Sequence, residues 1–585
     1  MTTVNEEQSQ AATMQLLERG ALLIVGGPGS GKTQTMAHRC AQLVERRVAP
    51  ERIMVLTFTR AAAASMRQRM LRMVGPAADG ILTGTFHAVA NLVFCTYDPD
   101  RQYCLLDEKH SHQLLEQAVR QSFPHLARYG YAPLLGAAKS RLHTSGGTPM
   151  VQQVVAAYTQ MKQDGEYWDY DDLLRKWLEF LQGEASAAFR QQIQYVLIDE
   201  MQDLDALQHC IIQEMYRSCM GLTAIGDDAQ SIYGFRGVRV RELQDFERRY
   251  TPARAVQLRR NYRNPPHIVR AAKRVLERNE NQRHREDMEP TKAPTEDKVP
   301  VRAYPTVAEE MAATVGRVRA AAGRQFILVR TNRYGDLAEA ELLLQGVPYH
   351  RYFPEAQGMR RHAKRCCSLL MLATSTDSSE RDTLWSDLLQ DLDLDLDLDL
   401  DLDLGADPAG PVAGPAAGPA AGLAGAVRRC GAPGLAAGPA LRVAEAALAG
   451  WTEPSDRAES SSFMEALRRL AAAHALLPDL VRHLSGSMVD PAAASVELMT
   501  IHLSKGLEAE HVYVVGMHDG GMPVLMDDTD EEEEVRIAYV ALTRAAATLH
   551  LSWSRVTETC SWGPPDPHKC SRFIANEHDL YQHIS

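Results

Sequence analysis

The chain has 585 residues, which is too long for a single hydrophobic core and favours about three to five domains. Its hydrophobic content of 45% and charged content of 24% are typical of water-soluble globular proteins, and it contains no apolar run of about eighteen residues, which argues against a membrane-spanning segment. The net charge of −12 does not exclude a nucleic-acid partner, because residues 391–404 and 527–534 each contribute seven negative charges.

Two further features bear on the cellular compartment. The first ten residues are polar and acidic, unlike a secretory signal, and the ten cysteines include no C-x-x-C pair. This pattern is typical of free thiols in a reducing environment, so we expect a cytoplasmic protein without a membrane partner.

A glycine-rich segment follows the first predicted strand. Residues 21–25 form an apolar run typical of a buried strand, residues 33–46 predict a helix, and GGPGSGKT between them matches G-x-x-x-x-G-K-[ST]. Glycines let successive N–H groups face a phosphate, and the helix N-terminus favours negative charge. We expect Lys32 to reach the β- and γ-phosphates and the Thr33 hydroxyl to bind magnesium. The sequence therefore predicts a nucleotide site at Gly26, Gly27, Pro28, Gly29, Ser30, Gly31, Lys32 and Thr33.

Strands and helices continue to alternate beyond this loop. Residues 52–58 predict a strand, and residues 61–74 a helix with a basic face that by default is solvated surface. Residues 89–189 predict a mostly helical insertion. Further strands are predicted at 195–198, 222–225 and 255–258, and a second set at 326–329, 496–501, 511–515 and 549–553. This alternation favours an α/β fold with parallel, doubly wound sheets, in two domains.

The second predicted domain is interrupted by a segment of biased composition. Residues 391–404 alternate Asp and Leu, and residues 405–439 are rich in Ala, Gly and Pro. Strict alternation is compatible with a strand, but the repeated aspartates repel one another. We therefore interpret 391–439 as a disordered or weakly ordered linker.

Carboxylates follow the strand predicted at 195–198. Asp199 and Glu200 come directly after it, at the strand end where a phosphate loop needs a metal ligand. We expect Asp199 to bind the metal and Glu200 to orient and deprotonate the attacking water. After the next strand, GDDAQSIYGFRG places polar groups that could sense a γ-phosphate beside aromatic rings able to stack on bases.

Eight segments stand in one order, namely GGPGSGKT, TFTRAAAASM, GTFH, DEMQD, GDDAQSIYGFRG, NYR, MTIHLSKGLE and YVALTRA. This ordered set resembles the superfamily 1 DNA helicases of the UvrD/Rep/PcrA type, over roughly residues 4–350 and 495–575. The resemblance implies two RecA-like P-loop motor domains. We expect the first at 1–88 and 190–263 with a helical insertion at 89–189, and the second at 264–359 and 492–585 with a shortened accessory insertion at 360–491.

The resemblance also implies contacts to ATP and Mg²⁺. Gln8 matches the residue that reads adenine, and Tyr262 the residue that stacks on it. Gln230 matches the γ-phosphate sensor, and Arg263 and Arg544 match arginines that stabilise charge on the γ-phosphate, which implies that the two motor domains must close for hydrolysis. Gln34 replaces an arginine that is frequent in the family, and Gly506 and Glu508 match the segment that contacts the nucleotide sugar.

For DNA, the resemblance implies two kinds of contact. Phe58, Tyr233 and Phe235 match residues that stack on single-strand bases, although core packing is the alternative for Phe58 and Phe235. Trp562 matches the tip of the strand-separating hairpin. The second kind is contact with the DNA backbone, expected at Thr57, Thr85, His87, Arg330 and His502, and Arg236 is also expected to bind DNA.

The function that follows is an ATP-dependent DNA helicase or translocase that moves 3′ to 5′ along single-stranded DNA, in repair, replication or recombination. Its expected partners are single-stranded DNA, single/double-strand junctions, and repair or replication proteins. One alternative is a DNA-stimulated translocase that displaces proteins but unwinds poorly. Another, of a different class, is an ATP-dependent DNA-binding switch that does not move.

Overall fold

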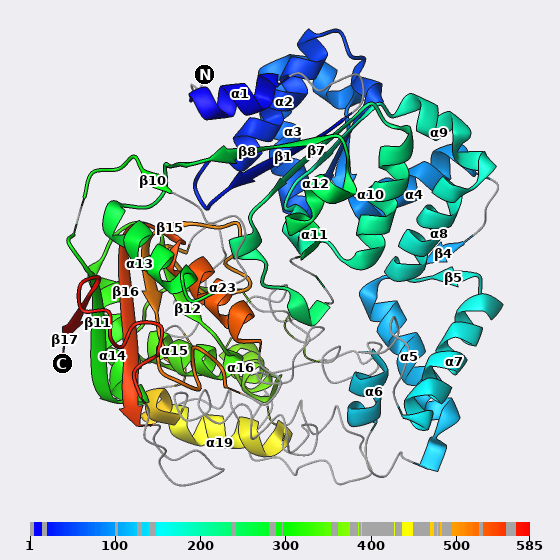
Figure 1. Ribbon diagram of the computed structural model, residues 1–585. Coiled ribbons are helices and arrows are strands. Elements are labelled where there is room, and N and C mark those ends of the chain that lie inside the picture. The colour runs from blue at the N-terminus through cyan, green and yellow to red at the C-terminus, as the bar shows by residue number, and fades with distance from the viewer. Residues whose placement is uncertain are drawn as a thin grey trace. The chain divides into compact units, whose positions relative to one another are not determined.

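The computed structural model describes residues 5–14, 20–99, 103–125, 131–139, 148–236, 238, 241–279, 288–294, 296–352, 361–374, 384, 388, 426, 436–448, 468–472, 477, 480–481, 494–525, 530–556 and 569–584. The chain divides into two compact units (Figure 1). The first comprises Met1–Tyr262 and Glu280–Thr291, and the second comprises Arg263–Asn279 and Lys292–Ser585.

The first unit is organised around a six-stranded sheet of order β3-β2-β6-β7-β1-β8, in which every neighbouring pair is parallel. Its strands are β1 (Gly20–Gly26), β2 (Ile53–Thr57), β3 (Leu82–Thr85), β6 (Tyr195–Ile198), β7 (Gly221–Gly226) and β8 (Ala253–Leu258). The apolar runs are buried on both faces, as a parallel sheet covered by helices requires. The predicted doubly wound α/β fold is confirmed.

Helices cover both faces of this sheet. On one face lie α1 (Glu6–Thr13), α2 (Lys32–Glu45) and α3 (Arg60–Val74), whose apolar residues share a core with Leu22 and Ile24. On the other face, α4 (Phe86–Tyr97), α8 (Tyr170–Gln182) and α10 (Ala206–Ser218) share a core with Leu23 and Val25. Side chains of β1 therefore alternate between two cores.

Helices predominate between residues 89 and 189, where the remaining ones are α5 (Glu108–Ser122), α6 (Ala132–Lys139), α7 (Pro149–Asp164) and α9 (Ala187–Gln192). A small sheet pairs β4 (Cys104–Leu105) with β5 (Tyr167–Trp168). α7 and α8 are joined by a buried ion pair, in which Lys162 Nζ lies 2.5 Å from carboxylate oxygens of Asp169 and Asp172. Asp169 also caps α8, so one carboxylate fixes both the start of α8 and its contact with α7.

The first unit ends with short elements. α11 (Arg241–Gln244) and α12 (Phe246–Arg249) precede β8, and β9 (Arg260–Asn261) follows it. β9 pairs in parallel with β10 (Glu289–Pro290), which belongs to the later stretch of chain that returns to this unit.

The second unit contains a seven-stranded sheet of order β13-β14-β12-β15-β16-β11-β17, and its neighbouring pairs are parallel as well. Its strands are β11 (Val299–Thr306), β12 (Gln325–Val329), β13 (His350–Tyr352), β14 (Val496–Thr500), β15 (Ala509–Val514), β16 (Ala545–Val556) and β17 (Tyr581–Ile584). On one face, Ile327 and Val329 share a core with α14 (Val307–Ala320), α15 (Asn332–Leu344), α16 (Arg361–Thr374) and α19 (Ala437–Leu448). Elsewhere in this unit, α13 (Pro266–Leu276) packs against α23 (Glu531–Leu542).

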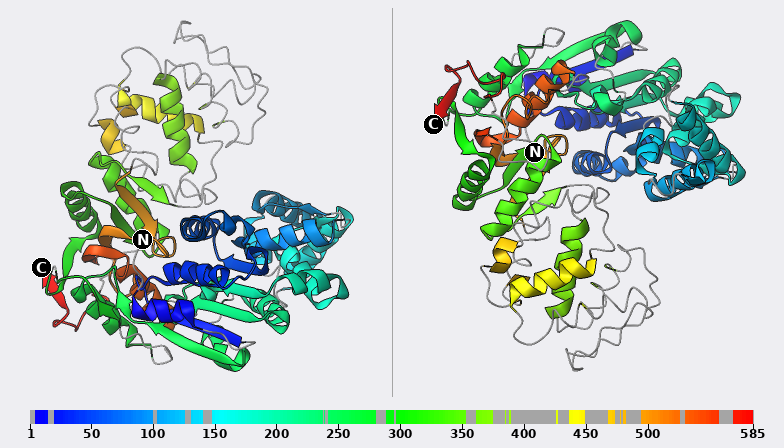
Figure 2. Two further views of the ribbon diagram at one scale, coloured as in Figure 1. Left: turned by 90° about the horizontal axis from the view of Figure 1, so that it is seen from above. Right: turned by 90° about the horizontal axis from the view of Figure 1, so that it is seen from below.

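In the accessory region, one helix departs from the expected linker. Residues 361–374 form a helix, α16, which packs against α19 (Figure 2). α19 begins at Ala437, so the end of the expected linker is helical rather than disordered. Alanine is the strongest helix former, and Pro439 lies in the first turn, where a missing N–H breaks no helical hydrogen bond. Within 391–435, the structure describes only Ala426, which is helical and buried.

Across the described ranges, we find no helix that combines the length and apolar character needed to cross a bilayer.

Candidate functional site

The glycine-rich loop joins β1 to α2 in the first unit. Gly29 and Gly31 adopt positive φ angles of 72° and 80°, which glycine tolerates without strain, and the loop thereby curls back onto the helix N-terminus. The buried amine of Lys32 lies inside the curl and donates to the carbonyl oxygens of Gly26 at 2.5 Å and Gly27 at 3.1 Å. The Thr33 side chain, in the first turn of α2, is half-buried. The loop therefore presents a cation and helix N–H groups at one point, as phosphate binding requires.

The N-terminal helix α1 contacts this loop. Gln8 donates from Nε2 to the carbonyl oxygen of Ser30 at 2.9 Å, and a Cβ at Gly31 would lie 2.3 Å from the same nitrogen. Asn5 caps α1 and also donates to the Tyr262 hydroxyl at 2.6 Å. The two residues predicted to bind adenine, Gln8 and Tyr262, are thus linked through Asn5, which the sequence analysis did not select.

The segment after β8 lies against the other side of the loop. The backbone N–H of Tyr262 donates to the Gly29 carbonyl oxygen at 2.9 Å, and Asn261 donates from Nδ2 to the Pro28 carbonyl oxygen at 3.0 Å. The Tyr262 ring is 41% exposed and is therefore accessible to a ligand. Asn261 is a second residue that the sequence analysis missed, although it lies within the NYR motif.

The carboxylates Asp199 and Glu200 follow β6. In the sheet, β7 separates β6 from β1, the strand that leads into the glycine-rich loop. Asp199 is only 3% exposed, and burial, followed by the nearby Glu200 carboxylate, raises its pKa to about 7. Glu200 adopts a positive φ of 54°, which is uncommon for a residue with a side chain, and its N–H donates to Asp199 Oδ1 at 3.1 Å. Backbone strain of this kind is concentrated at functional sites.

Gln202, in the short helix Met201–Asp203, connects these carboxylates to the loop after β7. Its amide donates to Glu200 Oε2 at 2.6 Å and accepts from the Asp227 N–H at 3.0 Å. Asp227 is fully buried, accepts a hydrogen bond from Gln230, and lies 3.9 Å from Lys32 Nζ. The structure therefore brings together Lys32, Asp199, Glu200 and Gln230 through a bridge, Gln202, that was not predicted.

These residues fit a divalent cation. Asp199, Asp227 and Asp228 are each at most 3% exposed, and Lys32 forms an ion pair with Asp227, so buried carboxyl groups outnumber the buried amine of Lys32 here. Carboxylate and hydroxyl oxygens are the ligands that Mg²⁺ prefers, and it commonly takes one or two carboxylates with substrate phosphates rather than a protein cage. In the described part of the chain, no group of three or more His, Cys, Asp or Glu side chains is placed to hold a metal ion.

Aromatic rings lie after the carboxyl ends of β2 and β7 in the same sheet. Phe58 and Tyr233 are stacked, with ring centroids 5.5 Å apart and an angle of 23° between planes. Tyr233 also meets Phe235 edge-on at 6.0 Å, and Phe235 is 69% exposed. Core packing, the alternative considered for Phe235, is therefore wrong, while Phe58 is half-buried. This row of rings is available to stack on unpaired bases.

The second unit brings another set of predicted residues together. Arg263 donates from Nε to Glu508 Oε2 at 2.5 Å and from Nη1 to the Thr543 carbonyl oxygen at 3.4 Å. Arg544 is buried and donates to the carbonyl oxygens of Val540 at 2.9 Å and Leu507 at 3.2 Å. Both arginines thus contact the turn before β15, where Gly506 has a φ of 83° and an open space in place of a side chain.

Comparison with known proteins agrees with this arrangement. The UvrD/REP helicase N-terminal domain matches residues 4–251, and the UvrD-like helicase C-terminal domain matches residues 256–357 and 447–556. The chain belongs to the UvrD-like helicase family. Among curated relatives, it is 26% identical to DNA helicase II of Escherichia coli strain K12, covering 98% of this chain and 87% of the relative.

Two further relatives of this UvrD-like helicase match over a similar extent. ATP-dependent DNA helicase PcrA of Bacillus subtilis strain 168 is 26% identical, covering 97% of this chain and 85% of the relative. ATP-dependent DNA helicase UvrD2 of Mycobacterium tuberculosis strain H37Rv is 28% identical, covering 98% of this chain and 81% of the relative. The match spans both units.

Several of the predicted DNA contacts have structural partners within the UvrD-like helicase. Thr57 donates to the Thr59 carbonyl oxygen at 3.1 Å, and Thr85 caps α4 by accepting from the Ala88 N–H at 3.3 Å. His87 packs edge-on against Tyr170 at 5.2 Å, and burial lowers the pKa of His87. These three side chains make contacts within the first unit, at the ends of β2 and β3 and in the first turn of α4.

In the second unit, Arg330 follows β12 and pairs with buried Glu534 on α23, with Nη2 2.5 Å from Oε1. His502 is half-buried in the turn after β14. Arg236 ends the short helix Gly234–Arg236. Trp562 lies outside the described residues.

Gln34, which stands where the family often has arginine, contacts an arginine from another helix. Its side-chain oxygen accepts from Arg69 Nη1 of α3 at 3.1 Å, and its nitrogen lies 3.0 Å from His38 Nε2. A guanidinium is therefore present beside this position, although it comes from the predicted basic face of α3.

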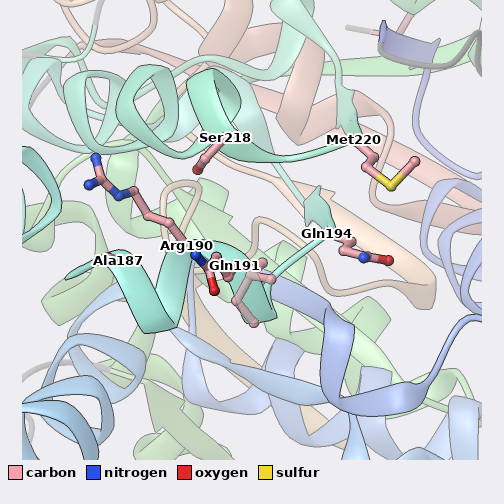
Figure 3. Close-up of a pocket in the computed structure, with 7 residues that line it drawn as sticks. Ala187, Arg190, Gln191, Gln194, Ser218 and Met220 are labelled. Carbon is pink, nitrogen blue, oxygen red and sulfur yellow. The ribbon is translucent and has the colours of Figure 1, made fainter.

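A pocket of about 320 Å³ lies at the opposite edge of the first sheet, near the amino ends of β6 and β7 (Figure 3). The guanidinium of Arg190 donates to the carbonyl oxygens of Leu181 at 3.1 Å and Gly183 at 3.5 Å. No carboxylate, histidine or cysteine lines it, so it offers no catalytic group. Its lining residues are Ala187, Arg190, Gln191, Ile193, Gln194, Ser218 and Met220.

Proposed function

We propose that this UvrD-like helicase is an ATP-dependent DNA helicase that couples hydrolysis of Mg-ATP to 3′ to 5′ movement along single-stranded DNA and to duplex unwinding, in repair, replication or recombination. The observation that carries the proposal is the hydrogen-bonded connection in the first unit between the phosphate-loop region and the aromatic row. Gln202 and Asp227 connect Glu200 to the segment of Tyr233 and Phe235. A chemical centre and a surface for unpaired bases therefore share one rigid sheet edge.

In this proposal each side chain has a defined role. Lys32 binds the β- and γ-phosphates, and Glu200 takes the proton from the attacking water. Magnesium, held by Thr33 and Asp199 when bound, neutralises phosphate charge. Arg263 and Arg544 stabilise charge that develops on the γ-phosphate. Gln8 and Tyr262 bind the adenine, with Gln34 nearby, and Glu508 with Gly506 contacts the sugar.

Gln230 connects hydrolysis to DNA. It donates a hydrogen bond to Asp227, at the start of the segment that carries Tyr233 and Phe235. Hydrolysis or release of the γ-phosphate would therefore change the position of Gln230. Only two residues separate Gln230 from Tyr233, so the base-stacking rings would move with it. Stacking tolerates every base, as a motor that moves along any sequence requires. Thr57, Phe58, Thr85, His87, Arg236, Arg330, His502 and Trp562 complete the proposed DNA contacts, at single-stranded DNA and at single/double-strand junctions.

Steady-state ATPase activity with and without a single-stranded oligonucleotide tests the proposal. We expect strong stimulation by DNA and its loss in Lys32→Ala and Glu200→Gln, while Lys176→Ala, which removes a partly exposed lysine on α8, retains it. Hydrolysis that does not respond to DNA would overturn the motor assignment and favour an ATP-dependent switch.

Partial duplexes with a 3′ or a 5′ single-stranded tail test polarity and unwinding. We expect strand separation on the 3′-tailed duplex only. Brisk DNA-stimulated hydrolysis with weak strand separation on both substrates would instead identify a translocase that displaces proteins from DNA.

A further inference from the structure

The sheet of the second unit carries several polar side chains on the face that α14 covers. The proposed helicase mechanism assigns no role to them. Register places Arg302 beside Ser552 and Tyr304 beside Ser554, while Tyr513 pairs with His550. Because alternate residues of a strand share a face, these side chains lie on one side of the sheet. α14 contributes Arg317 to the same group. We call Arg302, Tyr304, Arg317, Tyr513 and His550 the donor cluster.

His550 sits at the centre of the donor cluster. The Tyr513 ring stacks on it, with centroids 5.0 Å apart and an angle of 19° between planes. Arg302 Nη1 lies 3.4 Å from His550 Nδ1. A guanidinium can only donate, so Nδ1 is the acceptor and the neutral ring carries its proton on Nε2. Burial, followed by the charges of Arg302 and Arg317, lowers the pKa of His550 to about 4, which keeps the ring neutral.

The two arginines have no carboxylate partner within 4.0 Å among the residues that the structure describes. Arg317 lies over the Tyr304 ring, 5.8 Å from its centroid, and donates from Nη1 to the Ala313 carbonyl oxygen at 3.2 Å. Burial, followed by the charge of Arg317, lowers the pKa of Arg302, so the two cations oppose one another. Glu296 is the carboxylate whose charge acts on Arg302, and it forms no ion pair with it in the described structure.

The donor cluster also contains a donor without an acceptor. The Tyr304 hydroxyl is buried and finds no hydrogen-bond partner among the described residues. Leaving a buried polar group unsatisfied costs about 1–3 kcal/mol, so such groups usually have a partner in the working protein. The neighbouring acid on α14, Glu310, does not supply one: its Oε1 accepts from Ser552 at 2.7 Å and from the Gly516 N–H at 2.9 Å, and its Oε2 makes no hydrogen bond to the Tyr304 hydroxyl.

We propose that the donor cluster is a binding site for a phosphate-type oxyanion. Two guanidinium groups, a hydroxyl and an imidazole N–H are all donors, and what the group lacks is an acceptor with negative charge. A phosphate supplies several acceptor oxygens and matches the planar fork of arginine. The ligand chemistry is the same whether the phosphate is free or is carried by a nucleotide or a nucleic-acid end. The site is separate from the phosphate loop of the first unit and does not depend on the proposed motor function.

Equilibrium dialysis of radiolabelled inorganic phosphate against the full chain tests the proposal. The measurement is made on a Lys32→Ala background, which removes binding at the phosphate loop, with chloride used to hold ionic strength constant. We expect one phosphate per chain, and a loss of affinity of tenfold or more on adding Arg302→Gln or Arg317→Gln. Arg319→Gln, an exposed arginine on the same helix, is the matched control and retains binding.

Histidine NMR on the same protein provides a readout that does not depend on the arginine variants folding correctly. Phosphate, but not chloride, should shift the ring resonances of His550, and Arg317→Lys should retain part of the binding because it keeps the charge. Phosphate that does not bind to the Lys32→Ala protein, or that binds equally to Arg317→Gln, would overturn the assignment.

The source of the phosphate is distinguished by competition. Displacement by a 5′-phosphorylated dinucleotide, but not by the dephosphorylated form, assigns a carried phosphate. Displacement by unlabelled phosphate alone assigns the free ion.

Discussion

The side-chain amide of Gln202 lies between the carboxylate of Glu200 and the backbone of Asp227, donating to the first at 2.6 Å and accepting from the second at 3.0 Å. A Cβ at Gly226 would lie 2.9 Å from the Gln202 oxygen, so this glycine leaves room for the bridge. A general base must be held in one orientation by a third group, and Gln202 has that position relative to Glu200.

Replacing Gln202 by leucine should separate orientation of the base from nucleotide binding. We expect kcat for ATP to fall roughly 10- to 100-fold, a part of the roughly 10²- to 10⁴-fold that a positioned base supplies. KM for ATP should change little, because Gln202 is not among the proposed ATP contacts. The exposed Gln182→Ala is the control, and an unchanged kcat in Gln202→Leu would contradict the role.

Tyr262 offers a matched pair of substitutions at the proposed adenine site. Tyr262→Ala removes the stacking ring and should raise the dissociation constant for ATP by roughly 5- to 150-fold, corresponding to about 1–3 kcal/mol for one stacked base. Tyr262→Phe keeps the ring and removes only the hydroxyl that accepts from Asn5, so its affinity should stay within a few-fold of the original. Fluorescence titration with an ATP analogue measures both, and equal losses would exclude stacking.

Phe235 is exposed, so its removal should weaken DNA binding without affecting stability. Phe235→Ala should raise the dissociation constant for a single-stranded oligonucleotide by roughly 5- to 150-fold, whatever its sequence. Met220→Ala removes a residue of 42% exposure at the opposite edge of the sheet and should have no effect. Fluorescence anisotropy gives both affinities, and a thermal melt confirms folding. An affinity unchanged in Phe235→Ala would exclude this ring from the DNA contacts.

Glu310 makes stability depend on pH. Burial raises its pKa from 4.5 to about 7, so between these values the unfolded chain releases a proton that the folded chain retains. Stability therefore falls as pH rises through this window, by roughly 3 kcal/mol in total, and is constant above it. Glu310→Gln removes this loss of stability. The melting temperature of the variant, relative to that of the original protein, should therefore rise from pH 4.5 to pH 7. Exposed Glu309→Gln is the control, and parallel pH profiles for Glu310→Gln and the original protein would contradict the shift.

The parts of the fold that could be predicted from the sequence are those with strong local signals. The apolar run before Gly26 predicts β1, and the glycines with Lys32 predict the loop, because both signals lie within a few residues. β11 was missed because Pro300 and Pro305 interrupt its pattern, and proline within a run argues against a strand. β17 has four residues, as β6 does, but its sequence YQHI contains two polar residues and is not an apolar run, so it was missed.

The residues of the candidate site also differ in whether a local motif identifies them. Motif order selects Lys32, Asp199, Glu200 and Gln230, which the structure brings together in the first unit. Asn5 lies outside the eight motifs, and Gln202 lies within DEMQD, but the motifs do not show what either side chain contacts, because their partners lie far along the chain, at Tyr262 and Asp227. Hydrogen bonds of this kind depend on tertiary packing, so a local sequence pattern does not predict them.

The division of the chain between Tyr262 and Arg263 determines how this protein can be dissected. A fragment that stops at Tyr262 would lack Thr291, whose N–H and hydroxyl both donate to the Asn261 carbonyl oxygen. Asn261 is the residue whose amide supports the phosphate loop at Pro28. A cut at Tyr262 therefore removes part of the first unit, and a truncation series should lose support of the phosphate loop when the cut passes residue 291, in addition to the affinity lost earlier with the proposed contacts at Gly506 and Glu508.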